Sequence, residues 1–239
     1  MRLDVAFTPD EIVSSDLAER VVVVLDVLRA TSTIVEALAN GARAVSPAPG
    51  IDEAVRVAQN IGRDHALLCG ERRSRPIEGF DLGNSPREFT RERVEGKFLV
   101  MTTTNGTGAV LSSAGARRVI MGSFLNLSAV ADTLASDDGP ITLVCAGRAR
   151  QFALEDAVCA GMLATALASR LGAVPEMDDT GVAAMDLARL HGEDLAAMFA
   201  RTAAGRQLID ADLAEDLEFC ATIDRHTVIP ELHDRQITL

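Results

Sequence analysis

The chain has 239 residues, of which 48% are hydrophobic and 24% charged, which is enough for one large core. Its formal net charge of −12 repels polyanions, so we expect neither nucleic acid nor an anionic membrane as the main partner. There is no basic-then-apolar leader and no apolar run of about 18 residues, which predicts a cytoplasmic protein. The four cysteines form no CxxC pair, which argues against a zinc site.

The predicted elements alternate between strand and helix along most of the chain. Strands are predicted at 3–7, 21–25, 42–46, 66–70, 97–104, 118–123 and 141–147, and helices at about 32–40, 51–58, 108–111, 127–135 and 155–171. This order favours an α/β fold with a mainly parallel sheet and helices on both faces, in a single domain over 1–239. The segment from about 180 to 220 is Ala-rich and predicted to be helical, and 227–230 is expected to be a late strand or an extended tail.

Polar residues occupy the junction between the β-branched strand at 21–25 and the helix that follows it. Asp26 comes directly after the strand, and Arg29 and three hydroxyl residues follow at the helix start (Thr31, Ser32, Thr33). A carboxylate at a strand tip can hold Mg²⁺, and a guanidinium there can clamp a phosphate or a sulfonate. The alternative is a helix N-cap beside a structural Asp–Arg pair, and this stretch alone does not decide between the two.

Other carboxylates and donors lie at equivalent junctions. Glu71 and the pair Glu155-Asp156 follow predicted strands or open a helix, so the fold could gather them at one edge of the sheet. The long loop at 74–90 has no apolar period and is interpreted as an ordered active-site loop. The Gly-bearing loop at 103–107 leads into a helix N-terminus, which suits an anion, although a tight turn with a cap is the alternative.

Several familiar motifs are incomplete in this chain. The GxG at 106–108 lacks the third glycine of a dinucleotide-binding loop, because Leu111 stands there. No HExxH or Gly-x-Ser-x-Gly occurs, and Val27 and Leu28 stand where haloacid dehalogenase phosphatases carry a second acid. Histidine-based hydrolysis and a zinc site are therefore not expected.

A set of segments in the same order over nearly the whole chain resembles the 2-phosphosulfolactate phosphatases. The segments are DVLRATSTI at 26–34, CGER at 69–72, GFDLGNSP at 79–86, TTTNGT at 102–107, CAG at 145–147, ED at 155–156, EFCA at 218–221 and VIP at 228–230. The resemblance implies a three-layer α/β/α sandwich and a Mg²⁺-dependent phosphatase that converts 2-phosphosulfolactate to sulfolactate, a step toward coenzyme M. The match is weak from 180 to 215, where substrate differences could lie.

This resemblance suggests roles for the polar residues above. Asp26, Glu71 and either Glu155 or Asp156 would hold Mg²⁺, and Asp26, Arg29 and Glu71 would be the catalytic residues. Contacts to a small phosphorylated and sulfonated substrate would come from Arg29, Thr31, Ser32, Thr33, Arg72, Asn84, Ser85, Thr103, Thr104, Asn105, Gly106, Thr107 and Arg148. Attack by water and a route through an aspartyl-phosphate on Asp26 both remain open.

Two other functions remain open from the sequence, and a homodimer is compatible with all of them. The first is a NAD-dependent oxidoreductase that would use the turn at 106–108. The second is a protein that binds small anions without turnover.

Overall fold

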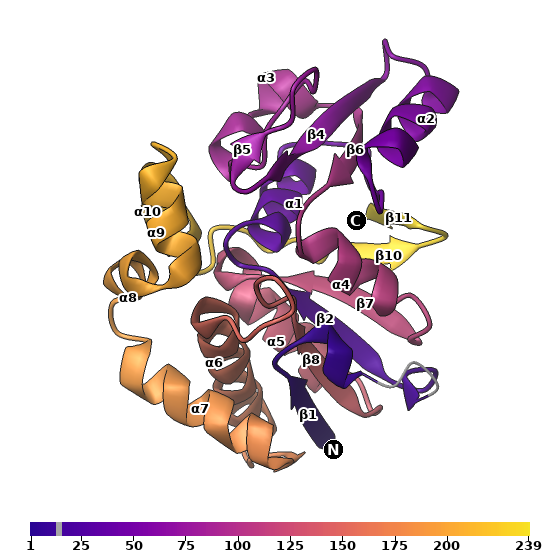
Figure 1. The fold of residues 1–239 in the computed structure, drawn as a ribbon. Coiled ribbons are helices and arrows are strands. Elements are labelled where there is room, and N and C mark those ends of the chain that lie inside the picture. The colour runs from indigo at the N-terminus through magenta and orange to yellow at the C-terminus, as the bar shows by residue number, and fades with distance from the viewer. Residues whose placement is uncertain (13–15) are drawn as a thin grey trace.

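The computed structural model describes residues 1–12 and 16–239 (Figure 1). Its strands are β1 (Arg2–Ala6), β2 (Val21–Leu25), β3 (Ala44–Pro47), β4 (Ala66–Arg72), β5 (Arg75–Pro76), β6 (Phe98–Thr102), β7 (Arg118–Gly122), β8 (Ile141–Cys145), β9 (Glu176–Met177), β10 (Glu231–His233) and β11 (Gln236–Thr238). Its α-helices are α1 (Ala30–Ala39), α2 (Ile51–Ile61), α3 (Arg91–Val94), α4 (Gly106–Ser112), α5 (Leu127–Ala135), α6 (Leu154–Leu171), α7 (Asp179–His191), α8 (Leu195–Arg201), α9 (Ala203–Asp210) and α10 (Glu215–Cys220).

All the strands belong to one mixed sheet with the order β5-β4-β6-β3-β11-β10-β7-β2-β8-β1-β9. Two parallel arms make up most of it. The first arm contains β4, β6 and β3, and the second contains β7, β2, β8, β1 and β9. The C-terminal hairpin of β10 and β11 joins the arms by antiparallel pairing with β7 and β3. The predicted α/β fold with a mixed, mainly parallel sheet is therefore confirmed.

The two arms enclose α1 and α4. One hydrophobic core contains Val22 and Val24 of β2, Leu99 and Met101 of β6, and apolar residues of both helices. Figure 1 shows α1 and α4 between β4 and β6 on one side and β2 and β7 on the other. Because β10 and β11 pair antiparallel with each other, with β7 and with β3, the strands of the two arms run in opposite directions along the sheet.

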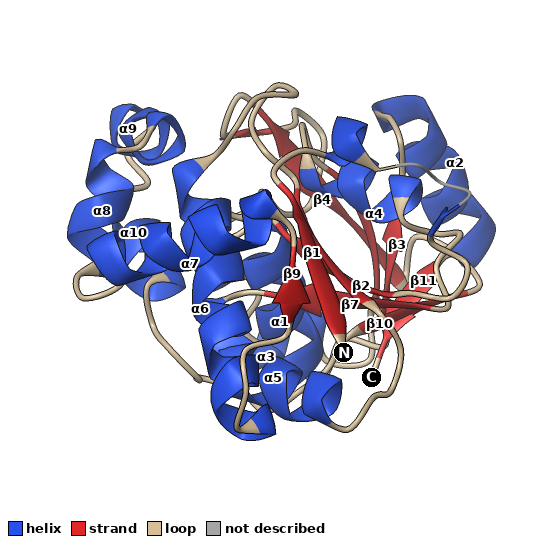
Figure 2. Ribbon diagram, turned by 90° about the horizontal axis from the view of Figure 1, so that it is seen from below, coloured by secondary structure: helices blue, strands red, loops and turns tan. Residues whose placement is uncertain are grey.

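The strand β2 is buried on both faces, as its unbroken β-branched sequence predicts. Its residues at 21, 23 and 25 pack into a second core with α5 and α6, whereas those at 22 and 24 face α1 and α4. A third, smaller core lies under α2, against β4 and β6. Figure 2 shows α5 to α10 on one side of the strands and α2 on the other.

The C-terminal third differs in part from the prediction. The helical region is confirmed as α7 to α10, and none of the described helices is long and apolar enough to cross a membrane. Of the two alternatives given for 227–230, the strand does not form, because these residues have no regular structure and the strand begins at Glu231. Likewise α1 begins at Ala30, so its hydroxyl residues lie inside the helix.

Candidate active site

Residues from both arms of the sheet line one cavity of about 270 Å³. Asp26 follows β2, Glu71 lies near the end of β4, and Thr103 and Thr104 follow β6. Gly147 and Arg148 follow β8, and Glu155 and Asp156 belong to the first turn of α6. The structure therefore brings together carboxylates that lie up to 130 positions apart in the sequence.

Asp26 lies at the centre of these carboxylates and is almost completely buried. Its Oδ1 accepts a hydrogen bond from the N–H of Ala30 (3.2 Å), and its own N–H donates to Thr31 Oγ1 (3.0 Å). Burial raises its pKa to about 7, and the negative charges of Glu71 and Glu155 add to the effect. Asp26 therefore changes its charge near neutral pH in the metal-free protein.

Glu71 and Asp156 hold the loops around the cavity through paired hydrogen bonds. The carboxylate of Glu71 accepts from the N–H groups of Thr104 and Ser74, both at 2.7 Å. The carboxylate of Asp156 accepts from Val27 (2.9 Å) and Gly147 (3.1 Å). The pKa of Asp156 lies well above its usual value because of burial and the nearby charges of Asp26 and Glu155. Each of these acids therefore connects separate strand ends.

Arg29 reaches the cavity with its guanidinium held on two sides. Its Nη1 donates to Asp216 of α10 (2.6 Å), and its Nη2 donates to the carbonyl of Ser74 (3.2 Å). The other oxygen of Asp216 accepts from Ser85 Oγ (2.6 Å). Asp216 was not predicted from the sequence. The pattern that could have indicated it is an acid next to Leu217 and near Cys220, which form the buried face of a short helix.

Several of the predicted substrate-binding hydroxyls have partners within the protein. Ser32 Oγ donates to the carbonyl of Val27 and Thr33 Oγ1 donates to that of Asn84, both at 2.9 Å. Thr31, Ser32 and Thr33 are completely buried and do not line the cavity. Like Ser85, these residues support the walls of the site.

The loop after β6 places some of its residues at the cavity and others behind it. Thr103, Thr104 and Asn105 line the cavity, whereas Thr107 exchanges hydrogen bonds with Thr103. A Cβ on Gly106 would lie 2.6 Å from Oδ2 of Asp26 and 2.5 Å from Cβ of Ala30. The backbone of Gly106 thus lies directly against the Asp26 carboxylate. The pyrophosphate of a dinucleotide such as NAD could not occupy the same position.

The arginines that face the cavity differ in part from those expected. Arg72 donates to the carbonyl of Thr102 (3.3 Å) and to its Oγ1 (3.0 Å) and does not line the cavity. Its neighbour Arg73 does, because the chain turns back into β5 at this point. Arg148 also lines the cavity and donates to Oε1 of Gln207 on α9. Arg73 and Gln207 were not predicted from the sequence.

One buried polar atom in the cavity wall has no partner. Oδ1 of Asn84 accepts no hydrogen bond in the described part of the chain, although its side chain is nearly completely buried. A buried acceptor left without a donor is costly, and such groups are typical of sites that bind a ligand. Asn84 lines the cavity and had been selected from the sequence as a neutral substrate contact.

The donor set is compatible with Mg²⁺, although no preformed metal cage exists. In residues 1–12 and 16–239, no group of three or more His, Cys, Asp or Glu side chains is arranged to hold a metal ion. Mg²⁺ needs only one or two carboxylates, because waters and substrate phosphate oxygens complete its shell. Burial raises the pKa of Asp26, Glu155 and Asp156, and a cation at this point would offset their mutual repulsion.

Comparison with known proteins assigns the chain to a family. A family model described as 2-phosphosulpholactate phosphatase matches residues 6–235. A probable 2-phosphosulfolactate phosphatase of Caldanaerobacter subterraneus is 40% identical over 94% of this chain and 92% of its own length. Those of Symbiobacterium thermophilum and Clostridium acetobutylicum are 42% and 34% identical, over 95% and 99% of this chain and 97% and 100% of their own lengths. The chain therefore belongs to the 2-phosphosulfolactate phosphatase family.

Proposed function

We propose that this protein is a Mg²⁺-dependent phosphatase that hydrolyses 2-phosphosulfolactate, or a related small phospho-hydroxy acid, to sulfolactate and phosphate. This proposal rests on one observation: Asp26, Glu71, Arg29 and the loop at 103–105 all line the same cavity. The relatives are themselves probable 2-phosphosulfolactate phosphatases, which supports this substrate, an intermediate expected in coenzyme M biosynthesis. The cavity volume of about 270 Å³ suits a three-carbon ester better than a nucleotide.

Asp26 would hold Mg²⁺ together with Glu71 or with a carboxylate of the pair Glu155-Asp156. When bound, the ion would neutralise charge on the transferring phosphoryl group and lower the pKa of a bound water. Glu71 and Asp156 already accept two backbone hydrogen bonds each, which fixes the direction of their remaining lone pairs.

The remaining residues of the cavity would bind the substrate. Arg29 would contact the phosphate, because the Asp216 carboxylate and the Ser74 carbonyl direct its guanidinium. Thr103, Thr104 and Asn105 would supply neutral contacts. Arg73 and Arg148 would face the carboxylate and the sulfonate, which the substrate carries in addition to its phosphate. The scarcity of aromatic residues agrees with a substrate that has no ring.

In the proposed reaction, a water molecule attacks phosphorus and the bond from phosphorus to the ester oxygen breaks. Asp26 accepts a proton from the attacking water, the departing oxygen takes up a proton from solvent to become the hydroxyl of sulfolactate, and Asp26 then returns its proton to solvent. In the second route, Asp26 attacks phosphorus itself, and water then hydrolyses the aspartyl-phosphate.

A phosphate-release assay with purified protein tests the proposal. Release from 2-phosphosulfolactate that requires Mg²⁺ and stops with EDTA is the expected result. Tight binding of the ester without release would indicate the anion-binding alternative, and nicotinamide-dependent redox activity that EDTA does not affect would indicate the oxidoreductase. Acid quenching followed by mass measurement separates the two routes, because only the second leaves a phosphoryl group on Asp26.

A further inference from the structure

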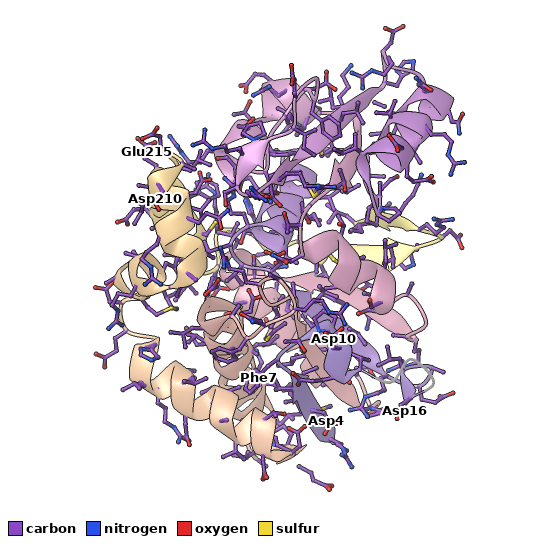
Figure 3. All side chains as sticks on the ribbon, viewed as in Figure 1. Asp4, Phe7, Asp10, Asp16, Asp210 and Glu215 are labelled. Atoms are coloured by element: carbon purple, nitrogen blue, oxygen red, sulfur yellow. The ribbon has the colours of Figure 1, made fainter. Side chains whose placement is uncertain are left out.

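Gln207 of α9 connects the two sides of the cavity. Its Oε1 accepts a hydrogen bond from Arg148 in the turn after β8, and its Nε2 donates to Ser74 Oγ in the turn after β4 (3.0 Å). These two turns belong to different arms of the sheet. Gln207 itself comes from the C-terminal helical region, in which Asp210 lies further along the same helix (Figure 3).

Both turns are tight and have the same backbone form. Arg73 and Ser74 have positive φ angles of 54° and 65°, and Ala149 and Arg150 have positive φ angles of 50° and 64°. In each turn the flanking residues pair as an antiparallel bridge. Two consecutive left-handed residues are typical of a two-residue hairpin. Each turn therefore holds one cavity-facing arginine, Arg73 or Arg148, on a short and well-defined segment.

The arginines near the cavity differ in whether their charge is neutralised. Arg29 forms an ion pair with Asp216, and Arg150 forms one with Asp10 (2.7 Å), which Figure 3 labels. Within the described residues, neither Arg73 nor Arg148 forms an ion pair within 4.0 Å of a carboxylate, although the charge of Arg148 acts on Glu155 across the cavity and partly offsets the rise in the pKa of Glu155 that burial causes. The side-chain partner of Arg148 is the uncharged amide of Gln207. An amide orients a guanidinium and leaves its positive charge available to a ligand.

We propose that Gln207 is a specificity-determining positioning residue. It holds Arg148, a cation without an ion-pair partner within 4.0 Å, opposite Arg73, so that the site favours phosphate monoesters that carry a further strong anion. This inference rests on the proposed phosphatase function and concerns the part of the substrate away from the phosphate. A glutamate at this position would also orient Arg148, but it would cancel the charge that the substrate needs.

Gln207 also contacts Ser74, so a variant of Gln207 changes two hydrogen bonds. Ser74, to which it donates, also donates its N–H to Glu71 and accepts from Arg29 at its carbonyl. Loss of the Gln207 side chain could therefore loosen the turn as well as Arg148. The variant Gln207→Glu keeps an acceptor for Arg148 and offers the Ser74 hydroxyl an acceptor in place of the lost amide donor, whereas Gln207→Met offers neither.

The experiment compares three esters with the wild type and both variants. The esters are 2-phosphosulfolactate, 2-phospholactate, which lacks the sulfonate, and isopropyl phosphate, which lacks both further anions. Gln207→Glu is expected to raise KM for 2-phosphosulfolactate about tenfold while kcat and the KM for isopropyl phosphate change by less than about twofold. Gln207→Met is expected to raise the same KM by only about threefold, because Arg148 keeps its charge.

The control is Gln59→Glu on the exposed surface of α2, which adds the same charge far from the cavity and should leave all three KM values unchanged.

Each outcome decides a different point. A purely structural role for Gln207 predicts the reverse order, with Gln207→Met more harmful than Gln207→Glu and with equal effects on the three esters, and this result would overturn the inference. Thermal unfolding of each variant shows whether a loss of activity reflects a loss of folding. If the wild type releases no phosphate from any ester, the proposed function itself fails, which is distinct from an active wild type whose selectivity does not depend on Gln207.

Discussion

Arg29 and Asp216 form an ion pair of 2.6 Å in which both side chains are almost fully buried, although 187 positions separate them in the chain. Asp216 lies on α10, and Arg29 lies between β2 and α1. The C-terminal helices therefore contribute directly to the orientation of a residue that lines the cavity.

The first prediction concerns this ion pair. Asp216→Asn leaves the guanidinium of Arg29 buried without a counter-charge, which is expected to lower the free energy of unfolding by about 3–5 kcal/mol. The adjacent variant Glu215→Gln is the control, because Glu215 pairs with Arg87 at the surface and such pairs contribute about 0–1 kcal/mol. Urea unfolding of both variants measures the difference. Equal decreases in the free energy of unfolding of the two variants would show that burial does not increase the contribution of the Arg29–Asp216 pair.

The second prediction concerns Gly106. A methyl group at this position would press on the Asp26 carboxylate, so Gly106→Ala is expected to lower kcat/KM by about 10²-fold. Gly108 lies in the same helix with no atom within 4 Å of its would-be Cβ. Gly108→Ala should therefore keep full activity and raise stability by roughly 0.5–1 kcal/mol. Similar activity in the two variants would contradict the role given to the close approach at Gly106.

The third prediction concerns turnover at Asp26. Asp26→Asn removes the proposed proton acceptor and a proposed metal-binding oxygen but keeps the shape of the side chain. Turnover of 2-phosphosulfolactate is expected to fall by about 10³-fold or more while the fold remains intact. Phosphate release and circular dichroism on the same sample measure the two properties. Wild-type rates in a folded variant would remove Asp26 from the mechanism.

The fourth prediction concerns the dependence of stability on pH without metal. Because the pKa of Asp26 is raised to about 7, the folded state binds more protons than the unfolded state between about pH 4 and 7. In EDTA, the free energy of unfolding should therefore fall as pH rises through this window. It should be lowest above pH 7, where Asp26 is ionised in the folded protein. Asp26→Asn should have a higher Tm than the wild type at pH 8 and lose this advantage near pH 4. Added Mg²⁺ should raise the Tm of the wild type more than that of the variant at pH 8.

The fifth prediction concerns the metal requirement. Glu71→Gln removes a negative charge from the cavity and keeps only one of the two acceptor oxygens that hold Thr104 and Ser74. The Mg²⁺ concentration for half-maximal activity is expected to rise about tenfold or more. Glu88→Gln is the matched control, because Glu88 accepts a hydrogen bond from the backbone N–H of Gly83 and does not line the cavity. An unchanged Mg²⁺ requirement in Glu71→Gln would place the ion elsewhere.

Local sequence was sufficient for much of the fold. The β-branched run at 21–25 predicted a strand buried on both faces, and the helices at 127–135 and 155–171 have boundaries within one residue of those observed. Regular apolar periodicity carries this information, because each element must bury one or both of its faces. The polar residues at strand ends were also visible, since a charge after a buried strand stands out from its neighbours.

Which of these residues face the cavity depended on contacts between distant segments. The choice of Arg73 over Arg72 depends on a turn of two residues. Asp216 and Gln207 approach the site because α10 packs against residues 86–88 and α9 packs against α8 and α10. The alternation of strands and helices along the chain predicted a mainly parallel sheet, whereas the C-terminal hairpin that separates its two arms was not predicted. The burial of α1 and α4 between the arms depends on packing between distant segments, and packing of this kind leaves no local pattern in the sequence.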